Sequence, residues 1–347
     1  MTLDCLNKYE KSQICVLSDK NLIRHPEWIA AKSLHDYPVL WLEVNEQNKS
    51  LETVTRIWDF LFEHSITRKG LLICFGGGVL TDLGGFAAST YKRGIDYINI
   101  PTTLLSMVDA STGGKTGFNY RELKNSIGTF DPPAAVIIDP TLLSTLPTDQ
   151  FLSGFGEMLK TGLIESTEYR AQSTDLLWNA LLQYDLNTMD IPSLTPLIHQ
   201  CLAVKNRIVA EDPKETGQRK VLNLGHTFGH ALEEMSLVNH KSSNRQLLHG
   251  YAVVYGLIAE LYLSVTKLGC PKEPLQQLTQ LMLHYYGRPQ CKCSDFDRLI
   301  ALMQQDKKSE HAAIINCTLI RSIGDPVINQ VISPDEAREA LDYLFSL

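Results

Sequence analysis

The sequence lacks an excess of basic residues, a long apolar run and any regular spacing of cysteines. Its 32 lysines and arginines are outnumbered by 39 acidic residues, so the net charge is −7 at pH 7. That balance argues against binding to nucleic acids or to anionic membrane surfaces. The longest apolar helical pattern, residues 251–265, is interrupted by Glu260 and is too short to span a bilayer. The eight cysteines are scattered, which is typical of reduced thiols in a cytosolic protein and excludes a disulfide framework.

What the sequence does contain is the length and composition of a two-domain globular protein. Its 347 residues are 44% hydrophobic and 20% charged, which is sufficient for two separate cores. Residues 1–11 are mostly polar, so we expect no secretory signal and a cytoplasmic location.

Short apolar segments alternate with helical patterns in the first 150 residues. A helix is expected over residues 51–64, and the apolar segments are 14–17, 39–44, 70–75, 97–100 and 135–138. Strands separated by helices predict a parallel sheet that is covered by helices on both faces. The first domain is therefore expected to be α/β.

Long helical patterns dominate after about residue 150. They cover residues 153–165, 194–210, 227–235 and 250–268. We therefore place a domain boundary near residue 150 and expect the second domain, residues 151–347, to be helical.

A glycine-rich turn, Gly76 to Gly78, follows an apolar segment and precedes a helix start. Glycines at such a turn let the backbone approach a pyrophosphate, which the helix N-terminus then stabilises. Thr81 stands where a dinucleotide fingerprint has its last glycine, so a plain tight turn is an equal alternative. Asp19, at the end of the first strand, is a better candidate for a ribose hydroxyl than Asp96, which lies among strand residues.

A second polar segment begins at Asp109 and ends at Asn125. Its glycines and Lys115 resemble a phosphate loop only in fragments, and without Walker A spacing we exclude a nucleoside-triphosphatase. With Lys124 it offers two lysines, an aspartate and an asparagine, a set that suits a polyhydroxylated anionic substrate. We expect these groups on a flexible loop, and a solvated charged loop is the alternative.

Three histidines of the second domain, together with one glutamate, form a candidate metal site. His226 and His230 open a helical pattern four residues apart, which puts both imidazoles on one face. His249 precedes another apolar helix, and Glu157 supplies a carboxylate upstream. Two or three histidines with a carboxylate indicate a catalytic divalent-metal site, most often zinc. A lone histidine is more often a core or surface residue, but the surrounding sequence favours the metal.

Other polar residues of the second domain recur at helical spacing. Lys160 follows Glu157 by three residues, and Lys205 lies on a later helix. Glu215, Arg219 and Asn223 recur every four residues and lead into His226. An ordinary solvated helix has the same pattern, but convergence with the histidines favours a site.

Taken together, these motifs resemble those of the 3-dehydroquinate synthases, a family of the sugar-phosphate cyclase superfamily. The resemblance covers nearly the whole chain and rests on residues 76–83, 101–105, 108–109, 113–117, 124–125, 223–230 and 249–250. It implies a Rossmann-like N-terminal domain, residues 1–150, that binds NAD. It also implies an all-α C-terminal domain, residues 151–347, that carries a metal and much of the substrate site, with the site between the two domains.

The resemblance also implies a role for individual residues. Zn2+ (or Co2+) would be held by Glu157, His226 and His249, which leaves His230 to face the substrate. The substrate-contacting positions are Asp109, Lys115, Asn125, Lys160, Lys205, Arg219, Asn223 and His230. Arg93 would reach the phosphate across a homodimer interface, joined by Lys307 or Lys308. The positions for NAD are Asp19, Glu46, Lys49, Gly78, Val79, Leu80, Thr81, Asp82, Thr102, Thr103, Lys115, Lys124 and Thr145.

Three positions depart from the family pattern. Tyr251 replaces the glutamate that commonly follows His249-Gly250, Thr81 replaces a glycine, and Asn45 replaces the glycine before Glu46. None of these changes removes a residue assigned above.

The activity implied by the resemblance belongs to the shikimate pathway of aromatic amino-acid biosynthesis. 3-Deoxy-arabino-heptulosonate 7-phosphate would become 3-dehydroquinate and phosphate by transient oxidation with NAD, β-elimination, reduction and intramolecular aldol closure. The enzyme would be a carbon–oxygen lyase with no net redox change. A related cyclase for another sugar phosphate, a metal-dependent polyol dehydrogenase and a non-catalytic binding protein are the alternatives. The many anion-binding groups argue against the dehydrogenase.

Overall fold

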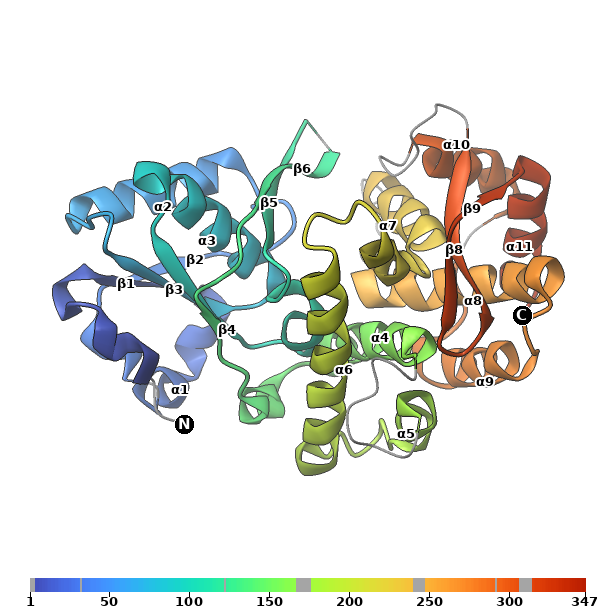
Figure 1. Cartoon of the computed structure of the whole chain (residues 1–347), viewed down its shortest axis with the longest axis horizontal. Coiled ribbons are helices and arrows are strands. Elements are labelled where there is room, and N and C mark those ends of the chain that lie inside the picture. The colour runs from blue at the N-terminus through green and yellow to red at the C-terminus, as the bar shows by residue number, and fades with distance from the viewer. Residues whose placement is uncertain are drawn as a thin grey trace. The chain divides into compact units, whose positions relative to one another are not determined.

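The computed structural model describes residues 4–31, 33–121, 123–166, 176–239, 247–290, 292–305 and 314–347. The chain forms two compact units, Met1–Leu146 and Pro147–Leu347 (Figure 1). Each unit has its own helices, strands and apolar core.

The first unit is built on a five-stranded parallel sheet in the order β2-β1-β3-β4-β7. Its strands are β1 (Ile14–Asp19), β2 (Val39–Leu42), β3 (Leu71–Gly76), β4 (Asp96–Pro101) and β7 (Ala135–Val136). Every residue of β3 is buried, as expected for a central parallel strand with both faces covered. The predicted α/β class is confirmed, and each of the five apolar segments contributes a strand.

The described residues of this unit include the α-helices α1 (Pro26–Ala31), α2 (Leu51–Glu63) and α3 (Gly78–Thr90). Helix α2 begins where the Ser50 hydroxyl accepts a hydrogen bond from the Thr53 backbone N–H. Its buried side chains follow helical spacing and pack with those of α3 and the sheet into one apolar cluster. Each such leucine or isoleucine contributes about 1.5–3 kcal/mol by its burial.

The segment expected as a flexible loop, from Asp109 to Asn125, instead begins in a helical turn and continues from Lys115 into a β-hairpin. Strand β5 (Lys115–Tyr120) pairs antiparallel with β6 (Leu123–Phe130). Phe118 of β5 is buried and packs edge-on against Phe86 of α3, with 5.1 Å between the ring centroids. The prediction of a flexible loop was wrong because this packing depends on an aromatic residue that lies far away in the sequence.

The second unit is helical, as predicted. Its α-helices are α4 (Thr148–Ile164), α5 (Leu177–Gln183), α6 (Ile191–Glu211), α7 (His226–Asn239), α8 (His249–Leu268), α9 (Glu273–Leu281), α10 (Phe296–Gln305) and α11 (Pro334–Ser346). The expectation of an all-α domain needs one correction, because β8 (Ile315–Ser322) and β9 (Asp325–Ile332) form an antiparallel hairpin. The Ile320 N–H of β8 donates to the Ser264 hydroxyl of α8, so tertiary contact stabilises this strand pair.

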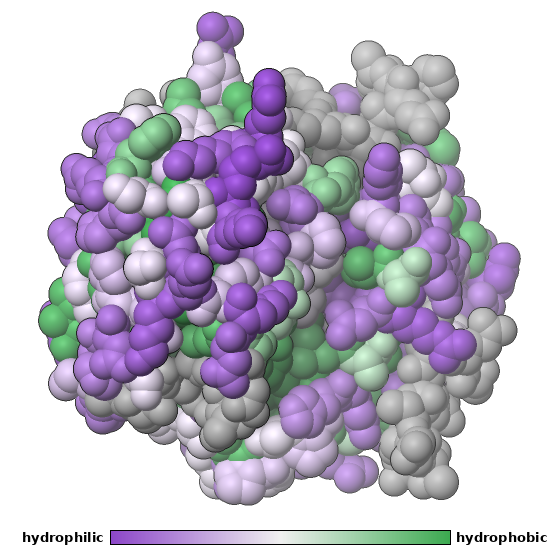
Figure 2. Space-filling view, turned by 60° about the vertical axis from the view of Figure 1, so that its left-hand side comes forward, coloured by the Kyte–Doolittle hydropathy of each residue, from purple (hydrophilic) through white to green (hydrophobic). Residues whose placement is uncertain are grey.

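Helix α8 forms the centre of the second unit. It is longer than the apolar pattern over residues 251–265, so the expectation that it is too short to span a bilayer was wrong: by length and composition alone it could cross a membrane, and it is the one such helix among the residues described here. However, 67% of its most apolar window is buried inside the protein, which is typical of a core helix. The surface of the protein is different: the face of the molecule drawn in Figure 2 is mostly hydrophilic, with apolar residues among the hydrophilic ones.

Candidate metal centre and cofactor pocket

Three helices of the second unit bring together one carboxylate and two imidazoles. Glu157 lies on α4, His226 begins α7 and His249 begins α8. One potential ligand atom of each residue lies within 4.8 Å of the others. The Glu157 Oε1 atom is 3.1 Å from His249 Nε2 and 3.5 Å from His226 Nε2. The structure therefore unites the three residues that the sequence assigns to a metal.

These distances fit a divalent metal ion. Zinc bonds of about 2.0–2.1 Å at a tetrahedral angle hold neighbouring ligand atoms roughly 3.4 Å apart. The two measured nitrogen–oxygen distances, 3.1 and 3.5 Å, lie on either side of that value. One carboxylate and two imidazoles also leave a coordination position for substrate or water, as in catalytic zinc sites.

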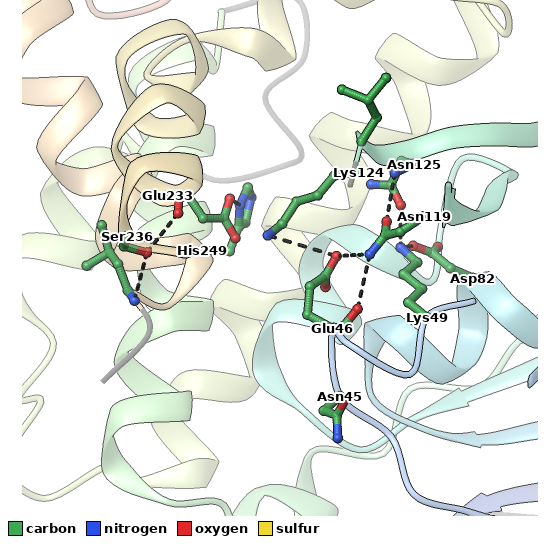
Figure 3. Close-up of polar contacts among 12 residues, drawn as sticks. Asn45, Glu46, Lys49, Asp82, Asn119, Lys124, Asn125, Glu233, Ser236 and His249 are labelled. Atoms are coloured by element: carbon green, nitrogen blue, oxygen red, sulfur yellow. Dashed lines mark hydrogen bonds and ion pairs between the residues drawn. The ribbon is translucent and has the colours of Figure 1, made fainter. Parts of the chain in front are cut away.

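The second ring nitrogen of each histidine, Nδ1, has a hydrogen-bond partner of its own, which leaves Nε2 facing Glu157. The side chains of His249 and Glu233 lie together (Figure 3), with 3.1 Å between Nδ1 and Oε2, and His226 Nδ1 lies 3.1 Å from the Leu224 carbonyl oxygen. A ligating histidine commonly donates its second N–H to a carboxylate or a carbonyl group, which fixes its tautomer and orientation. Both histidines have such a partner.

Each of the three candidate ligands follows a glycine or precedes one, and these glycines let the helices approach closely. A Cβ atom on Gly250 would lie 1.7 Å from the Ser153 carbonyl oxygen of α4, and one on Gly156 would lie 2.5 Å from the Gly250 carbonyl oxygen. Gly225, before His226, has φ +80°, and its own carbonyl oxygen would be 1.9 Å from a Cβ on Gly256. Close backbone approach thus sets the distances between Glu157, His249 and His226.

The N-terminus of α7 is held by a buried carboxylate. Glu260 of α8 is fully buried and accepts hydrogen bonds from the backbone N–H groups of Gly225 and Thr227, at 2.5 and 3.1 Å. Unsatisfied N–H groups and the helix dipole make a helix N-terminus favourable for a carboxylate. The charge that interrupts the apolar pattern of α8 therefore positions His226.

Electrostatics keep the Glu157 carboxylate ionised. Its burial alone would raise its pKa, but Lys160, which forms an ion pair with it, and His249 hold the pKa well below its usual range. Burial opposes the charged form of His249 as well, yet Glu233 and Glu157 raise its pKa to about 10. The Glu157 and Glu233 carboxylates thus favour positive charge at His249, while Lys160 balances the charge of Glu157.

Replacing Glu233 by glutamine is expected to weaken metal affinity by about 10–100-fold, the usual effect of losing an outer-shell carboxylate. The amide would still fit the space but would no longer pair with His249 as a charged acceptor. Metal affinity can be measured by competition with a chromogenic chelator. Glu234→Gln, the same change at the exposed next residue, is the matched control, and equal affinities in the two variants would contradict this role.

The remaining predicted residues of this unit lie on several elements. His230 follows His226 on α7, and its ring centroid is 5.1 Å from that of His226 and 6.0 Å from that of His249. The imidazoles of His226, His230 and His249 therefore converge, although His230 is outside the ligand triad. Lys205 is buried on α6.

Arg219 and Asn223 lie on a 3-10 helix, η8 (Gln218–Asn223), where a regular solvated helix was the alternative. Arg219 is buried and donates from Nη1 to the Pro213 carbonyl oxygen at 2.7 Å, and Asn223 Nδ2 donates to Glu215 Oε1 at 2.9 Å. The burial of Arg219 contradicts the alternative of a solvated helix. Lys307 and Lys308 lie outside the described residues.

The glycine-rich turn of the first unit has the predicted local structure. Strand β3 ends at Gly76, Gly77 caps α3, and the helix begins at Gly78. Leu80 and Thr81 are buried, and the Thr81 hydroxyl donates to the Gly78 carbonyl oxygen at 2.9 Å. Thr81 therefore fits inside the helix at the position where the family has glycine.

Other predicted cofactor residues follow strand ends of the same sheet. Asp19 ends β1, and Thr102 and Thr103 directly follow β4. Carboxyl ends of parallel strands lie at one edge of a sheet, where α/β proteins bind their ligands. Thr145 ends a 3-10 helix, η7 (Pro140–Thr145), and the half-buried Val79 follows Gly78 on α3.

A cavity of about 310 Å³ lies within the first unit. Lining residues include Asp82, Lys115, Ser126 and Asn125. Asp82 pairs with the buried Lys49 at 2.5 Å. The structure thus brings Asp82, Lys115 and Asn125 together, as the resemblance implies.

Two further predicted residues of this unit lie on short helical turns. Asp109 lies on a π-helical turn, η6 (Ser106–Ala110). Arg93 is exposed at the end of η5 (Tyr91–Arg93).

Several residues with clear structural roles were missed from the sequence. Glu233 lies two helical turns after His226 on α7, so helical spacing puts both side chains on the same face of the helix. That spacing could have identified Glu233 from the sequence. Glu260 gave no such signal, and neither did Asn119 of β5, whose side chain donates to Glu46 Oε1 at 2.8 Å, because their partners lie far away in sequence.

A parallel-sheet unit followed by a helical unit is a fold shared with solved sugar-phosphate cyclases. The 2-epi-5-epi-valiolone synthase of Streptomyces hygroscopicus, solved with NAD+ and Zn2+ bound, has a TM-score of 0.80 and 27% identity, with 96% of this chain and 90% of that chain covered. This similarity agrees with the site described above.

Comparison of sequences narrows the class to one family. Residues 39–153 match the family model described as 3-dehydroquinate synthase N-terminal, and residues 154–309 match 3-dehydroquinate synthase C-terminal. A 3-dehydroquinate synthase of Parabacteroides distasonis is 45% identical, covering 88% of this chain and 83% of the relative. One from Streptococcus pyogenes serotype M18 is 38% identical, covering 90% and 84%. The chain belongs to the 3-dehydroquinate synthase family.

Proposed function

We propose that this chain is a 3-dehydroquinate synthase that converts 3-deoxy-arabino-heptulosonate 7-phosphate to 3-dehydroquinate and phosphate. The convergence of Glu157, His226 and His249 carries the proposal, because it supplies a metal centre with an open position in a member of this family. The 45% identity to a curated 3-dehydroquinate synthase supports the same substrate.

The metal would be held by Glu157 and by the Nε2 atoms of His226 and His249. When bound, Zn2+ or Co2+ supplies a Lewis acid that lowers the energy of negative charge on a substrate oxygen. Glu233 and the Leu224 carbonyl group keep the two imidazoles in the tautomer that binds a cation. Lys160 balances the charge of Glu157 in a site where both side chains are almost fully buried.

The cofactor NAD would be held by residues of the first unit. The backbone N–H groups at the start of α3, from Gly78 onward, suit its pyrophosphate, and Asp19 suits a ribose hydroxyl. When bound, NAD supplies a hydride acceptor that is regenerated within one turnover. The other assigned contacts are Glu46, Lys49, Val79, Leu80, Thr81, Asp82, Thr102, Thr103, Lys115, Lys124 and Thr145.

The substrate carries a carboxylate and a phosphate, and the chain offers several cationic groups for them. We assign Lys115, Lys205 and Arg219 to these anions, since charge-assisted hydrogen bonds strengthen where water is excluded. Asn125, Asn223 and Asp109 suit hydroxyl contacts, and His230 suits a hydroxyl contact or proton transfer. The departing phosphate is itself a base that can accept the proton lost in the elimination.

We further propose a cytoplasmic homodimer in which Arg93 reaches the substrate of its partner subunit. The exposure of Arg93 in one subunit supports this role.

The proposal is tested by identifying the products. Purified protein is incubated with the heptulosonate phosphate, and products are analysed by NMR and a phosphate assay. We expect 3-dehydroquinate and phosphate in equal amounts, with both lost on chelation and restored by Zn2+ or Co2+. Turnover of a heptulose phosphate that lacks the carboxylate, at a higher kcat/KM, would instead indicate a related cyclase.

A further inference from the structure

Asn119 of β5 contacts three residues that the proposed function assigns to ligands. Its side-chain Nδ2 donates to Glu46, to the carbonyl oxygen at 3.1 Å and to Oε1 at 2.8 Å. Its Oδ1 accepts the backbone N–H of Asn125 at 2.8 Å, and its own N–H donates to the Lys49 carbonyl oxygen at 2.8 Å. Figure 3 shows the side chain of Asn119 between those of Glu46 and Asn125.

The backbone at this position is arranged for these contacts. The pairing register of β5 and β6 shifts between Phe118 and Tyr120, so Asn119 lies at an irregularity in the ladder. Such irregularities release backbone groups and redirect side chains. The released N–H of Asn119 bonds to Lys49, which precedes α2, instead of to β6.

Asn125 is held from both sides. Its φ of +47° is a left-handed conformation that asparagine tolerates better than most residues. Its backbone N–H is fixed by Asn119, and its side-chain Oδ1 accepts from Lys49 Nζ at 2.5 Å. Because Lys49 Nζ also donates to Asp82 at 2.5 Å, the hairpin and the segment from Glu46 to Lys49 form one hydrogen-bonded unit.

We propose that Asn119 is a positioning residue that couples the cofactor-binding segment, Glu46 to Lys49, to Asn125 of the substrate pocket. This inference rests on the proposed function, because it takes Glu46 as a contact of NAD and Asn125 as a contact of the sugar phosphate. Each end of the Asn119 amide orients one of them. Binding of either ligand would therefore preorganise the contacts of the other.

Two substitutions test the contacts of the Asn119 side-chain oxygen and nitrogen separately. Asn119→Asp keeps the oxygen that accepts from Asn125 but places a carboxylate against Glu46. Asn119→Ala removes both contacts. We expect the aspartate variant to raise the Kd for NAD by about 10–100-fold, the usual effect of losing a hydrogen bond to a charged group. The alanine variant should raise both this Kd and the KM for the sugar phosphate.

A third substitution tests whether the effect runs through Glu46. In the Glu46→Gln background, the amide of the new side chain can donate to the carboxylate introduced by Asn119→Asp, with donor and acceptor reversed. We expect Asn119→Asp to weaken NAD binding much less in this background than in the unmodified protein, because only the contact with the Glu46 carbonyl oxygen remains lost. A merely structural role of Asn119 would instead give the same loss in both backgrounds.

The measurements are NAD affinity by isothermal titration calorimetry, KM and kcat, and Tm for each variant. Asn329→Asp, the same change at an exposed residue of the second unit, is the matched control and should leave all four values unchanged. Unaltered NAD affinity and KM in both Asn119 variants would overturn the inference. Failure of the unmodified protein to bind NAD would overturn the proposed function instead.

Discussion

Replacing Glu157 by glutamine is expected to remove the bound metal and to lower kcat/KM for phosphate release by at least about a thousandfold. The amide cannot supply the anionic ligand between His226 and His249, and a Lewis acid contributes several kcal/mol to such a step. Metal content after purification, measured by inductively coupled plasma mass spectrometry, should fall from one ion per chain to near zero. Retention of one ion with unchanged activity would contradict the metal assignment.

Glu157→Gln is also expected to lower the stability of the protein, because it removes the negative charge that faces the buried Lys160. Breaking a buried ion pair typically costs about 3–5 kcal/mol of stability. The double variant Glu157→Gln with Lys160→Met replaces the pair by neutral side chains of similar size and should recover much of the Tm. It should still bind no metal. Recovery of metal along with Tm would show that Glu157 serves the fold and not the ion.

Gly250→Ala is expected to give the second large effect, a loss of both stability and metal. The added methyl group would lie 1.7 Å from the Ser153 carbonyl oxygen, a backbone atom that can move only with α4. Overpacking typically costs about 1–3 kcal/mol and more where backbone must shift. Separating α4 from α8 also separates Glu157 from His249, so metal affinity should fall together with the Tm.

A matched glycine at the other end of α8 distinguishes packing from backbone effects. Gly269 caps the helix with φ +70°, and a Cβ atom there would have no neighbour within 4 Å. Gly269→Ala should therefore cost about 1 kcal/mol from backbone strain alone and leave metal affinity unchanged. If Gly250→Ala behaved in the same way, the close approach of α4 and α8 would not set the metal geometry.

Much of this structure is predictable from local patterns. The buried strands of the sheet are continuous apolar runs, and the main helices have apolar residues at helical spacing, so both were found from the sequence. The candidate metal site was also predicted, since two histidines four residues apart opened a helical pattern and the family motifs pointed to Glu157, His226 and His249, which the structure brings together. In these cases the information lies within a few residues of the chain.

The features that were missed depend on partners far away in sequence. Strands β5 and β6 are stabilised by packing of Phe118 on Phe86, and β8 by the Ser264 hydroxyl. Asn119 lies 73 residues from Glu46, and Glu260 lies 35 residues from Gly225. No local pattern identifies such partners, which is why the hairpins and the positioning residues required the structure.

The most direct test of the account is the ratio of phosphate released to NADH formed in a single cuvette. Protein loaded with metal is given the heptulosonate phosphate in large excess over NAD, and both quantities are followed together. The account predicts many phosphates per NAD with no rise in NADH absorbance, because the cofactor is regenerated in each turnover. One NADH formed per substrate consumed, or NADH formed without phosphate release, would contradict a redox-neutral cyclase and indicate a dehydrogenase.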